Sequence, residues 1–357
     1  MSIDAATQKR VVMRRNEFDI GVIGAGIVGA AAAYQLRDCG TICILEKNEA
    51  ACMEASGNNS SVLHPGFNHP PGSLKGRLCV RGNALLYEYC RSKRIPHIRC
   101  GTYVLAMSRD DEESLERLRE NALDLGVELQ VRMPEHRHAS VRSAVFAPAG
   151  GIVDVSGLCG SLIAESGADL RCGYLVREIR YTESGWQLVS DRGTVRCQIL
   201  VNAAGLYSDE ISAMSGYPGY RIFPCAGEYY EIEGWQSPHL FYPAPNEGPS
   251  LGLHLSPTLR GTTLIGPTAA YISSKNDPAR YTKEDEFRDA AELMFPGSTS
   301  YPVRMAHRGI RPKLAEKGFR DFVIRKEDRP LVQLIGIESP GLTSCLAIGE
   351  VVREALM

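Results

Sequence analysis

The sequence lacks the long apolar run that a membrane-spanning helix requires. No hydrophobic stretch among its 357 residues approaches the roughly 18 to 20 residues that cross a bilayer. Neither sign of charge is in excess, since 40 Lys and Arg residues oppose 42 Asp and Glu residues for a net charge of −2. A balance this even gives no global reason to bind nucleic acid or an anionic membrane surface. We therefore expect a globular protein without a nucleic-acid partner.

Paired or clustered cysteines are absent as well. The 11 cysteines include no CxxC motif, and no group of His and Cys has the spacing of a zinc site. Scattered cysteines are typical of small core residues in a reducing compartment, so we expect a cytoplasmic protein with no metal. The basic residues before Asp19 lack the apolar segment of a signal peptide, which predicts a short disordered leader.

What the sequence does contain begins with a β-α-β unit. Residues 18–23 form a short apolar strand, an alanine-rich helical stretch runs to Leu36, and residues 41–45 form a second strand after Gly40. The turn between the first strand and the helix reads Gly24-Ala25-Gly26-Ile27-Val28-Gly29, a GxGxxG motif. In this context the motif predicts a dinucleotide site.

Each part of the motif has a physical role. Gly24 permits the tight turn, Gly26 lets a pyrophosphate approach the backbone, and Gly29 lets the helix and strand pack closely. The helix N-terminus adds free N–H groups and the positive end of the helix dipole. Glu46 closes the second strand, 22 residues after Gly24, where its carboxylate can accept bonds from ribose hydroxyls. Because Glu46 would repel a 2′-phosphate, the motif indicates FAD or NAD and not NADP.

Three further segments favour FAD over NAD. Residues 54–61 offer small polar groups beside the motif, residues 199–205 return small residues to it, and residues 336–343 form a loop that opens a helix. That last helix N-terminus can stabilise negative charge at the N1/C2=O side of a reduced flavin. An extended cofactor that three distant segments touch is FAD. We expect FAD to be bound by Gly24, Gly26, Ile27, Val28, Gly29, Glu46, Lys47, Ser56, Asn59, Ser60, Ser61, Val176, Ala203, Ala204, Gly205, Gly309, Arg311, Gly341, Leu342 and Thr343.

Seven short motifs outside the GxGxxG turn carry a family resemblance. They are NSSVLHPG at 59–66, PGSLKGRLC at 71–79, NAAGLY at 202–207, GEYY at 227–230, GIRPKL at 309–314, DFVI at 321–324 and IESPGLT at 337–343. Together they resemble the D-amino-acid-oxidase-like superfamily of FAD-dependent oxidoreductases, most of all the L-2-hydroxyglutarate dehydrogenases and oxidases. The resemblance extends over about residues 18–355.

Three features depart from the family pattern. Ala226 stands where the family has Arg before Gly-Glu-Tyr-Tyr, residues 67–69 replace a Tyr-rich stretch, and the region between Ala270 and Tyr301 is short. These positions fall where the resemblance places substrate selectivity. They leave the flavin chemistry intact and the identity of the 2-hydroxy acid open.

The pattern and the resemblance together imply an α/β fold. We expect a Rossmann-type FAD-binding domain with an inserted α+β substrate domain that is built on a mostly antiparallel sheet. The FAD-binding domain should comprise residues 17–95, 145–221 and 302–357, and the substrate domain residues 96–144 and 222–301.

Oxidation of a 2-hydroxy acid requires a carboxylate clamp and a base, because a hydride leaves Cα and a proton leaves the hydroxyl. Arg311 in the GxRP motif is the expected clamp, since a guanidinium grips a carboxylate with two parallel bonds. The alternative for Arg311 is a structural ion pair. Arg308 is a weaker candidate.

His64 is the expected base, because it follows the FAD-contacting segment and an imidazole can accept a proton at neutral pH. His254 alternates with apolar residues on a strand and is the second candidate; either histidine has a packing role as its alternative. Lys75 is expected either to attract the distal carboxylate of a diacid or to be a solvated lysine at a helix start. Tyr229 and Tyr230 point to opposite faces of a strand, so at most one faces substrate, and we expect Tyr229.

The leading hypothesis is FAD-dependent oxidation of a small 2-hydroxy acid, with L-2-hydroxyglutarate implied by the resemblance. Because a fold does not fix a function, an amine, amino-acid or glycerol-3-phosphate oxidoreductase stays as the second hypothesis. A FAD-binding subunit of a larger dehydrogenase complex is the third. The electron acceptor stays open between oxygen, a quinone and a protein, and so does contact with a membrane surface or a partner subunit.

Overall fold

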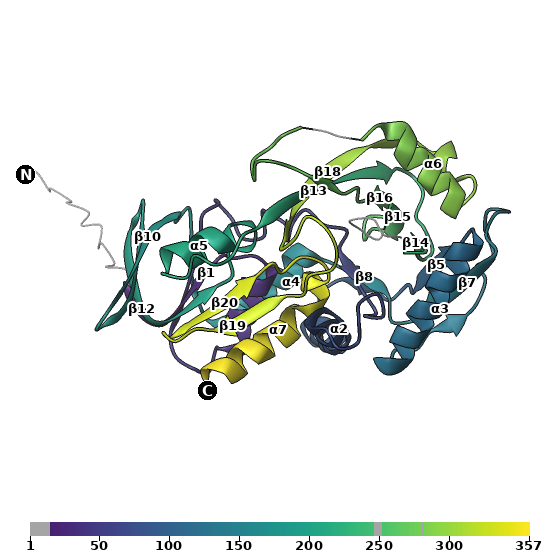
Figure 1. Ribbon diagram of the computed structural model, residues 1–357. Coiled ribbons are helices and arrows are strands. Elements are labelled where there is room, and N and C mark those ends of the chain that lie inside the picture. The colour runs from purple at the N-terminus through teal and green to yellow at the C-terminus, as the bar shows by residue number, and fades with distance from the viewer. Residues whose placement is uncertain (1–14, 246–251, 280–281) are drawn as a thin grey trace, which may run out of the picture.

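The computed structural model describes residues 15–245, 252–279 and 282–357 (Figure 1). Most of the segment in which we expect a disordered leader, residues 1–14, lies outside the described residues. Within the described chain, the strands form sheets of eight, nine and three strands, and no helix is long and apolar enough to cross a bilayer. All 11 cysteines are unpaired, and most of them are buried in the core.

The eight-stranded sheet contains the β-α-β unit. Its parallel strands are β1 (Glu17–Ile23), β2 (Ile42–Glu46), β9 (Asp169–Cys172), β12 (Gly193–Asn202) and β20 (Leu331–Ile335). Strands β2 and β20 are buried along their whole length, as is typical of a parallel sheet. The antiparallel members are β10 (Val176–Thr182), β11 (Gly185–Ser190) and β19 (Val323–Lys326).

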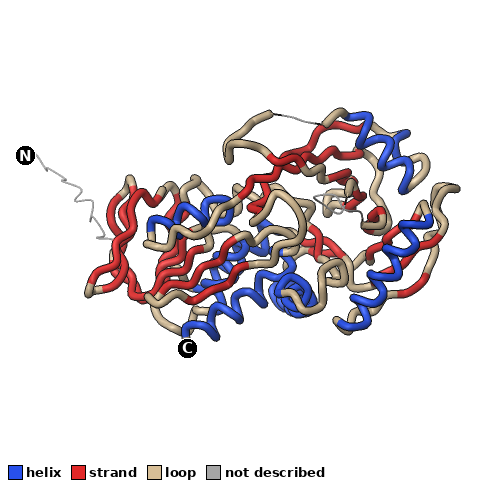
Figure 2. The backbone as a smooth tube through the Cα atoms, viewed as in Figure 1, coloured by secondary structure: helices blue, strands red, loops and turns tan. Residues whose placement is uncertain are grey.

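Four helices share one hydrophobic core with this sheet: α1 (Ile27–Gln35), α2 (Leu74–Lys93), α4 (Val155–Ser166) and α7 (Gly341–Leu356). Helices α2, α4 and α7 are labelled in Figure 1, and Figure 2 shows helices beside the strands of the sheet. Alanines of α1 let α4 and α7 approach closely. A second core on the sheet gathers Trp186 and Leu188 with residues of the short helix α5 (Ser208–Met214). Between β12 and α5 lies the 3-10 turn η1 (Gly205–Tyr207).

The nine-stranded sheet is mostly antiparallel. Its strands are β5 (Thr102–Ala106), β6 (Gln130–Val131), β7 (Ser143–Ala147), β13 (Phe223–Ile232), β14 (Leu240–Pro243), β15 (His254–Pro257), β16 (Thr263–Gly266), β17 (Ala270–Tyr271) and β18 (Val303–Lys313). Helix α6 (Glu284–Met294) and the 3-10 turn η2 (Ser298–Ser300) follow β17, and α3 (Arg109–Asp124) follows β5. A three-stranded sheet of β3 (Val62–Leu63), β8 (Gly151–Val153) and β4 (His97–Ile98) completes the set.

Two strands lie on the other side of the expected boundaries. The boundaries put residues from 145 and from 302 onwards in the FAD-binding domain, yet β7 pairs with β5 and β6, and β18 pairs with β13 along its whole length. Local sequence indicates that a segment is a strand but not which strand it will pair with, so the membership of these two strands was not predictable. The division into two domains stays our interpretation.

Candidate functional site

The turn between β1 and α1 has the geometry that the GxGxxG motif predicts. Gly24 has φ +105°, and a Cβ atom there would overlap the carbonyl of Ala203 at the end of β12. A Cβ atom at Gly29 would overlap the carbonyl of Gly24, so the third glycine serves the packing of the turn itself. A Cβ atom at Gly26 would meet only the Ser56 hydroxyl, at 2.9 Å. Gly26 is therefore the glycine beside which a ligand has room to approach the backbone.

Glu46 stands at the end of β2, where the sequence places it. Its carboxylate is buried and accepts bonds from the amides of Ala25 at 2.9 Å and Asn48 at 2.8 Å. These bonds fix the acid beside the turn and leave lone pairs for ribose hydroxyls. Lys47 pairs with Glu54 and lies over the ring of Tyr207, 4.9 Å from its centroid.

Among the described α-helices, α1 and α7 begin with neither a side-chain cap nor an acidic residue in the first turn. Helices α5 and α6 also lack a side-chain cap, but their first turns hold acidic residues. The N-cap side chains Ser73 of α2, Ser108 of α3 and Asp154 of α4 accept bonds from the first turns of their helices. The N-cap residues of α1 and α7 are Gly26 and Pro340, which offer no side-chain cap, and neither first turn holds an acidic residue. Since a helix N-terminus carries partial positive charge, α1 fits a pyrophosphate and α7 fits a reduced flavin.

Several other expected cofactor residues are connected to the first turns of α1 and α7 or to the loop of residues 54–61. The Ser56 hydroxyl accepts from the Ile27 amide at 2.9 Å, which ties residues 54–61 to the start of α1. Further along, a Cβ atom at Gly309 of β18 would overlap the carbonyl of Asn58, and the Thr343 hydroxyl of α7 accepts from the His64 amide at 3.0 Å.

The remaining members of the expected set are placed less uniformly. Asn59 pins its own loop, because its side chain donates to two backbone carbonyls and accepts from the Ser61 amide. Val176 buries its side chain in the core below the sheet, so only its backbone remains for a cofactor. The roles of all these residues stay predictions.

One face of the nine-stranded sheet carries a row of aromatic and imidazole side chains. The row runs across five adjacent strands: Tyr242 on β14, His254 on β15, Gly266 on β16, Tyr229 on β13 and His307 on β18. Tyr242 stacks on His254 at 4.0 Å between centroids, and Tyr229 stacks on His307 at 4.4 Å. Gly266 leaves a gap between the two stacks. The neighbouring residue Tyr230 packs on Phe287 of α6 instead, so Tyr229 is the tyrosine on the candidate face.

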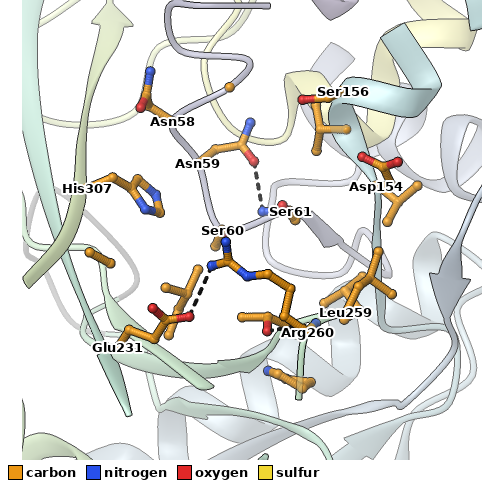
Figure 3. Close-up of a pocket in the computed structure, with 18 of the residues that line it drawn as sticks. Asn58, Asn59, Ser60, Ser61, Asp154, Ser156, Glu231, Leu259, Arg260 and His307 are labelled. Atoms are coloured by element: carbon orange, nitrogen blue, oxygen red, sulfur yellow. Dashed lines mark hydrogen bonds and ion pairs between the residues drawn. The ribbon is translucent and has the colours of Figure 1, made fainter. Parts of the chain in front are cut away.

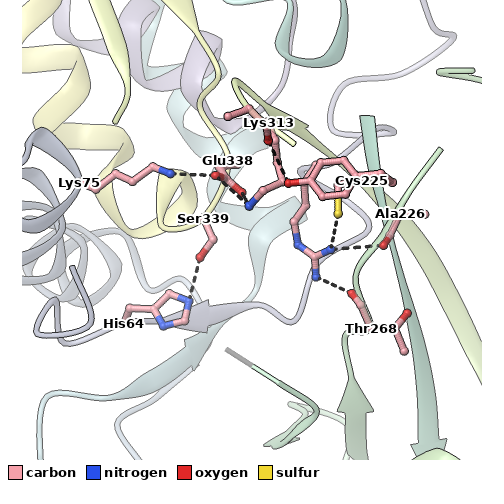
Figure 4. Close-up of polar contacts among 11 residues, drawn as sticks. His64, Lys75, Cys225, Ala226, Thr268, Lys313, Glu338 and Ser339 are labelled. Atoms are coloured by element: carbon pink, nitrogen blue, oxygen red, sulfur yellow. Dashed lines mark hydrogen bonds and ion pairs between the residues drawn. The ribbon is translucent and has the colours of Figure 1, made fainter. Parts of the chain in front are cut away.

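Arg311 lies on the same face of β18, four residues beyond His307. Its guanidinium lies across Gly227, where a Cβ atom would come within 2.8 Å, and it donates to the carbonyls of Thr268 at 3.0 Å and Ala226 at 3.4 Å (Figure 4). Among the described residues no carboxylate pairs with Arg311, so the alternative of a structural ion pair is not observed there. Several of the five N–H groups remain for an anionic ligand.

His64 follows β3, and both its backbone amide and its backbone carbonyl are hydrogen-bonded. Its amide donates to Thr343, its carbonyl accepts from Asn83 at 3.0 Å, and its Nε2 lies 3.4 Å from the hydroxyl of Ser339. Burial lowers the pKa of His64 to about 4. The imidazole is therefore neutral at pH 7 and able to accept a proton.

His254 is enclosed more completely than His64. Burial lowers its pKa to about 3, its Nδ1 lies 3.3 Å from the Gly252 carbonyl, and its Nε2 is buried with no hydrogen-bond partner among the described residues. Tyr242 lies between the two histidines, because its ring stacks on His254 and meets His64 edge-on at 6.3 Å. The Tyr242 hydroxyl is likewise buried without a partner in the described chain.

Lys75 is not the solvated lysine that was one of its two expected roles. Its side chain is only 5% exposed, which excludes the solvated lysine, and its ammonium donates to Glu338 at 2.8 Å. The physical reason is that α2 begins inside the molecule, against Phe322 and the loop before α7. Lys75 is thus already paired, and its contact with a distal carboxylate stays a prediction that the structure does not support.

A cavity of about 640 Å³ lies beside residues 56–61 and His307 (Figure 3). Residues 56–61 form one wall of the cavity, and Ser60 among them lies close to Tyr229. The described lining includes the expected cofactor residues Ser56, Asn59, Ser60 and Ser61 and the row residue His307, but not Arg311, His64 or Glu46. The rest of the lining consists of residues 152–156, 257–260 and 304–307 with Glu231 and Leu264.

Sequence reasoning missed Tyr242 and Glu338 as parts of the site. Glu338 lies inside a quoted motif, and its signal was the lone acid between apolar Ile337 and the start of α7. Tyr242 had no local signal, since only the pairing of β14 with β15 brings it to His254.

The comparisons with known proteins agree with this geometry. Residues 19–355 match the family model described as FAD dependent oxidoreductase. The L-2-hydroxyglutarate dehydrogenase of Nematostella vectensis is 33% identical over 86% of this chain and 75% of its own, and that of Arabidopsis thaliana is 30% identical over 94% and 83%. The glycerol 3-phosphate dehydrogenase of Caloramator mitchellensis is 28% identical over 95% and 74%.

Solved structures agree on the fold. The FAD-bound L-α-glycerophosphate oxidase of Mycoplasma pneumoniae superposes with a TM-score of 0.84 at 21% identity, covering 96% of this chain and 95% of its own. Glycine oxidase from Geobacillus kaustophilus gives 0.83 at 20% identity over 96% and 95%. The expected α/β fold and the expected cofactor, FAD, are confirmed. This chain is an enzyme of the FAD-dependent oxidoreductase family.

Proposed function

We propose that this enzyme oxidises a 2-hydroxy acid, with L-2-hydroxyglutarate as the first candidate. The observation that carries the proposal is Arg311, a partly buried guanidinium without a carboxylate partner in the described chain, on the face that also bears His254 and Tyr229. A planar fork of N–H groups suits a substrate carboxylate. Relatives that are named for L-2-hydroxyglutarate support the particular acid.

In this proposal the chain's residues divide the work. FAD, when bound, supplies the hydride acceptor at N5. Arg311 holds the α-carboxylate and so aims the Cα hydrogen. Neutral His64 accepts the hydroxyl proton at Nδ1, while its Nε2–H donates to the exposed Ser339 hydroxyl. The Nε2 of His254, by contrast, is shielded.

Glycerol 3-phosphate is the second candidate, because one relative of 95% coverage is named for it and an arginine also grips a phosphate. It too is oxidised at a secondary alcohol. A panel of L-2-hydroxyglutarate, L-lactate, glycerol 3-phosphate and sarcosine under anaerobic conditions separates the candidates, with bleaching of the flavin as the readout. Fast bleaching by glycerol 3-phosphate alone would overturn the hydroxy-acid proposal.

Arg311 is then tested with the acid that bleaches fastest. Arg311→Ala should lose about 2 to 5 kcal/mol of transition-state stabilisation. This corresponds to a roughly 30- to 5,000-fold lower ratio of the flavin-reduction rate to the apparent Kd of the substrate. Arg311→Lys keeps the charge without the fork and should lose less. Arg304→Ala is the matched control, since Arg304 lies on the same strand, is exposed and pairs with Glu233. Equal rates in all four proteins, or loss of FAD with Arg311, would remove it from the substrate site.

A further inference from the structure

Two lysines, one on helix α2 and one on strand β18, converge on one buried carboxylate. Lys75 at the start of α2 donates to Glu338 at 2.8 Å, and Lys313 at the end of β18 donates to it at 3.1 Å (Figure 4). The three side chains are 5%, 13% and 10% exposed. Burial alone would raise the pKa of Glu338, but the charges and hydrogen bonds of Lys75 and Lys313 outweigh burial and lower it. Glu338 is therefore ionised and held from two sides.

This cluster connects the two large sheets of the molecule. Helix α2 packs in the core of the eight-stranded sheet, whereas β18 belongs to the nine-stranded sheet, so Glu338 is tied to both. Asp321 strengthens the tie, because its carboxylate accepts from the amides of Leu74 at 2.6 Å and Lys75 at 2.9 Å. The loop between β20 and α7 is thereby fastened at Glu338.

The ion pairs of Glu338 fix the residues that surround His64. Ser339 directly follows Glu338, and its hydroxyl lies 3.4 Å from His64 Nε2. Two residues later α7 begins, and its Thr343 holds the His64 amide. A buried ion pair with several partners specifies one geometry more reliably than it adds stability.

We propose that Glu338 is a positioning residue for the oxidation: its two ion pairs hold Ser339 against His64 and so set the orientation of the imidazole. The proposal rests on the proposed function only in needing a substrate that reduces the flavin. Lys75 and Lys313 act in it as anchors of Glu338 and not as ligands of the substrate.

The experiment is a double-mutant cycle between Glu338→Gln and Ser339→Ala. We measure the limiting rate of anaerobic flavin reduction with the acid that bleaches the native protein fastest. Each single variant should reduce about tenfold more slowly, and the double variant should be no slower than the worse single variant, because both act through the same contact. Effects that multiply, or a native rate in Glu338→Gln, would overturn the proposal.

Glu350→Gln is the matched control for losing an ion pair to helix α2. Glu350 of α7 pairs with Arg81 of α2 at 2.8 Å on the surface, away from His64. This variant should reduce at the native rate and keep its FAD. If Glu350→Gln were as slow as Glu338→Gln, the effect would belong to helix packing and the proposal would be wrong.

Lys75→Met covers the case in which Glu338→Gln does not fold, because it leaves the Glu338–Lys313 pair intact. It should slow reduction by the same factor for a dicarboxylic and a monocarboxylic 2-hydroxy acid, with the apparent Kd changed less than threefold. A weaker Kd for the dicarboxylic acid alone would make Lys75 a substrate ligand and contradict the positioning role. If no hydroxy acid bleaches the native protein, the proposed function fails, and the same cycle is run with the panel member that does.

Discussion

The cofactor side and the substrate side of this enzyme are built from different materials. On the eight-stranded sheet the site is made of backbone: bare glycines, two helix ends without side-chain caps, and one carboxylate that is itself fixed by amides. On the nine-stranded sheet the site is made of side chains that project from four strands, β14, β15, β13 and β18. A backbone site is sensitive to added atoms, whereas a side-chain site is sensitive to removed ones.

The largest effect should come from adding atoms on the cofactor side. Gly26→Val places a side chain where the pyrophosphate approaches, yet its Cβ meets only the Ser56 hydroxyl, so the protein should fold and be colourless. Gly29→Ala should instead fail to fold, because its Cβ overlaps the Gly24 carbonyl. Absorbance at about 450 nm, where flavins absorb, and circular dichroism check both variants. A yellow Gly26→Val protein would contradict the backbone site.

Removing the imidazole on the substrate side should come next. His64→Ala should slow flavin reduction by roughly 10²- to 10⁴-fold if His64 is the base. Because the pKa of His64 is about 4, the native rate should be flat from neutral pH to about pH 5 and fall as the imidazole protonates below that. Rapid-mixing rates across this range provide the measurement. A variant with the native rate and the native profile would transfer the role to His254.

A smaller effect should follow the one cofactor-side change that removes atoms. Glu46→Ala should weaken FAD binding by about 1 to 3 kcal/mol, the range for lost charge-assisted bonds. Titration of the apoprotein with FAD gives the affinity. Glu54→Ala is the control, since Glu54 is exposed nearby and pairs only with side chains. Equal affinities in both variants would take Glu46 out of the ribose site.

The smallest expected effect is a change in the free energy of unfolding that should have opposite signs for two tyrosine replacements. The Tyr242 hydroxyl is buried without a partner in the described residues, so Tyr242→Phe should raise the free energy of unfolding of the apoprotein by about 1 kcal/mol. Tyr89→Phe should lower it, because the Tyr89 hydroxyl bonds to Ser161 at 2.8 Å. Urea denaturation measures both. Destabilisation by Tyr242→Phe would indicate a bond that the hydroxyl makes to water or to a neighbour.

The two sides also differ in how far the sequence predicts them. The β-α-β unit, the glycine turn and Glu46 lie within 30 residues of chain, and the structure places each element within one or two residues of its expected position. Local sequence is enough there because the contacts are local. His64 and Arg311 were reachable only through the family motifs.

The remainder depends on pairing between distant strands. Tyr242 meets His254 because β14 pairs with β15, and Lys75 meets Glu338 across 263 residues of sequence. No periodicity carries that information, so Lys75 was expected to face solvent or a substrate and instead faces an acid. The same limit applies to β7 and β18, whose partners in the nine-stranded sheet could not be read from local sequence.

The burial of the two candidate bases has a consequence for the whole molecule in acid. His64 and His254 have folded pKa values of about 4 and about 3, below the ordinary 6.5, so the unfolded chain takes up protons at these positions that the folded chain refuses. With both histidines neutral, the free energy of unfolding has its full value above pH 6.5. It declines as the pH falls toward 4, because the unfolded state then binds more protons than the folded state. The enzyme should therefore denature with net proton uptake over that range. Replacing His254 with Phe, which stacks on Tyr242 equally well, should flatten the decline of the melting temperature.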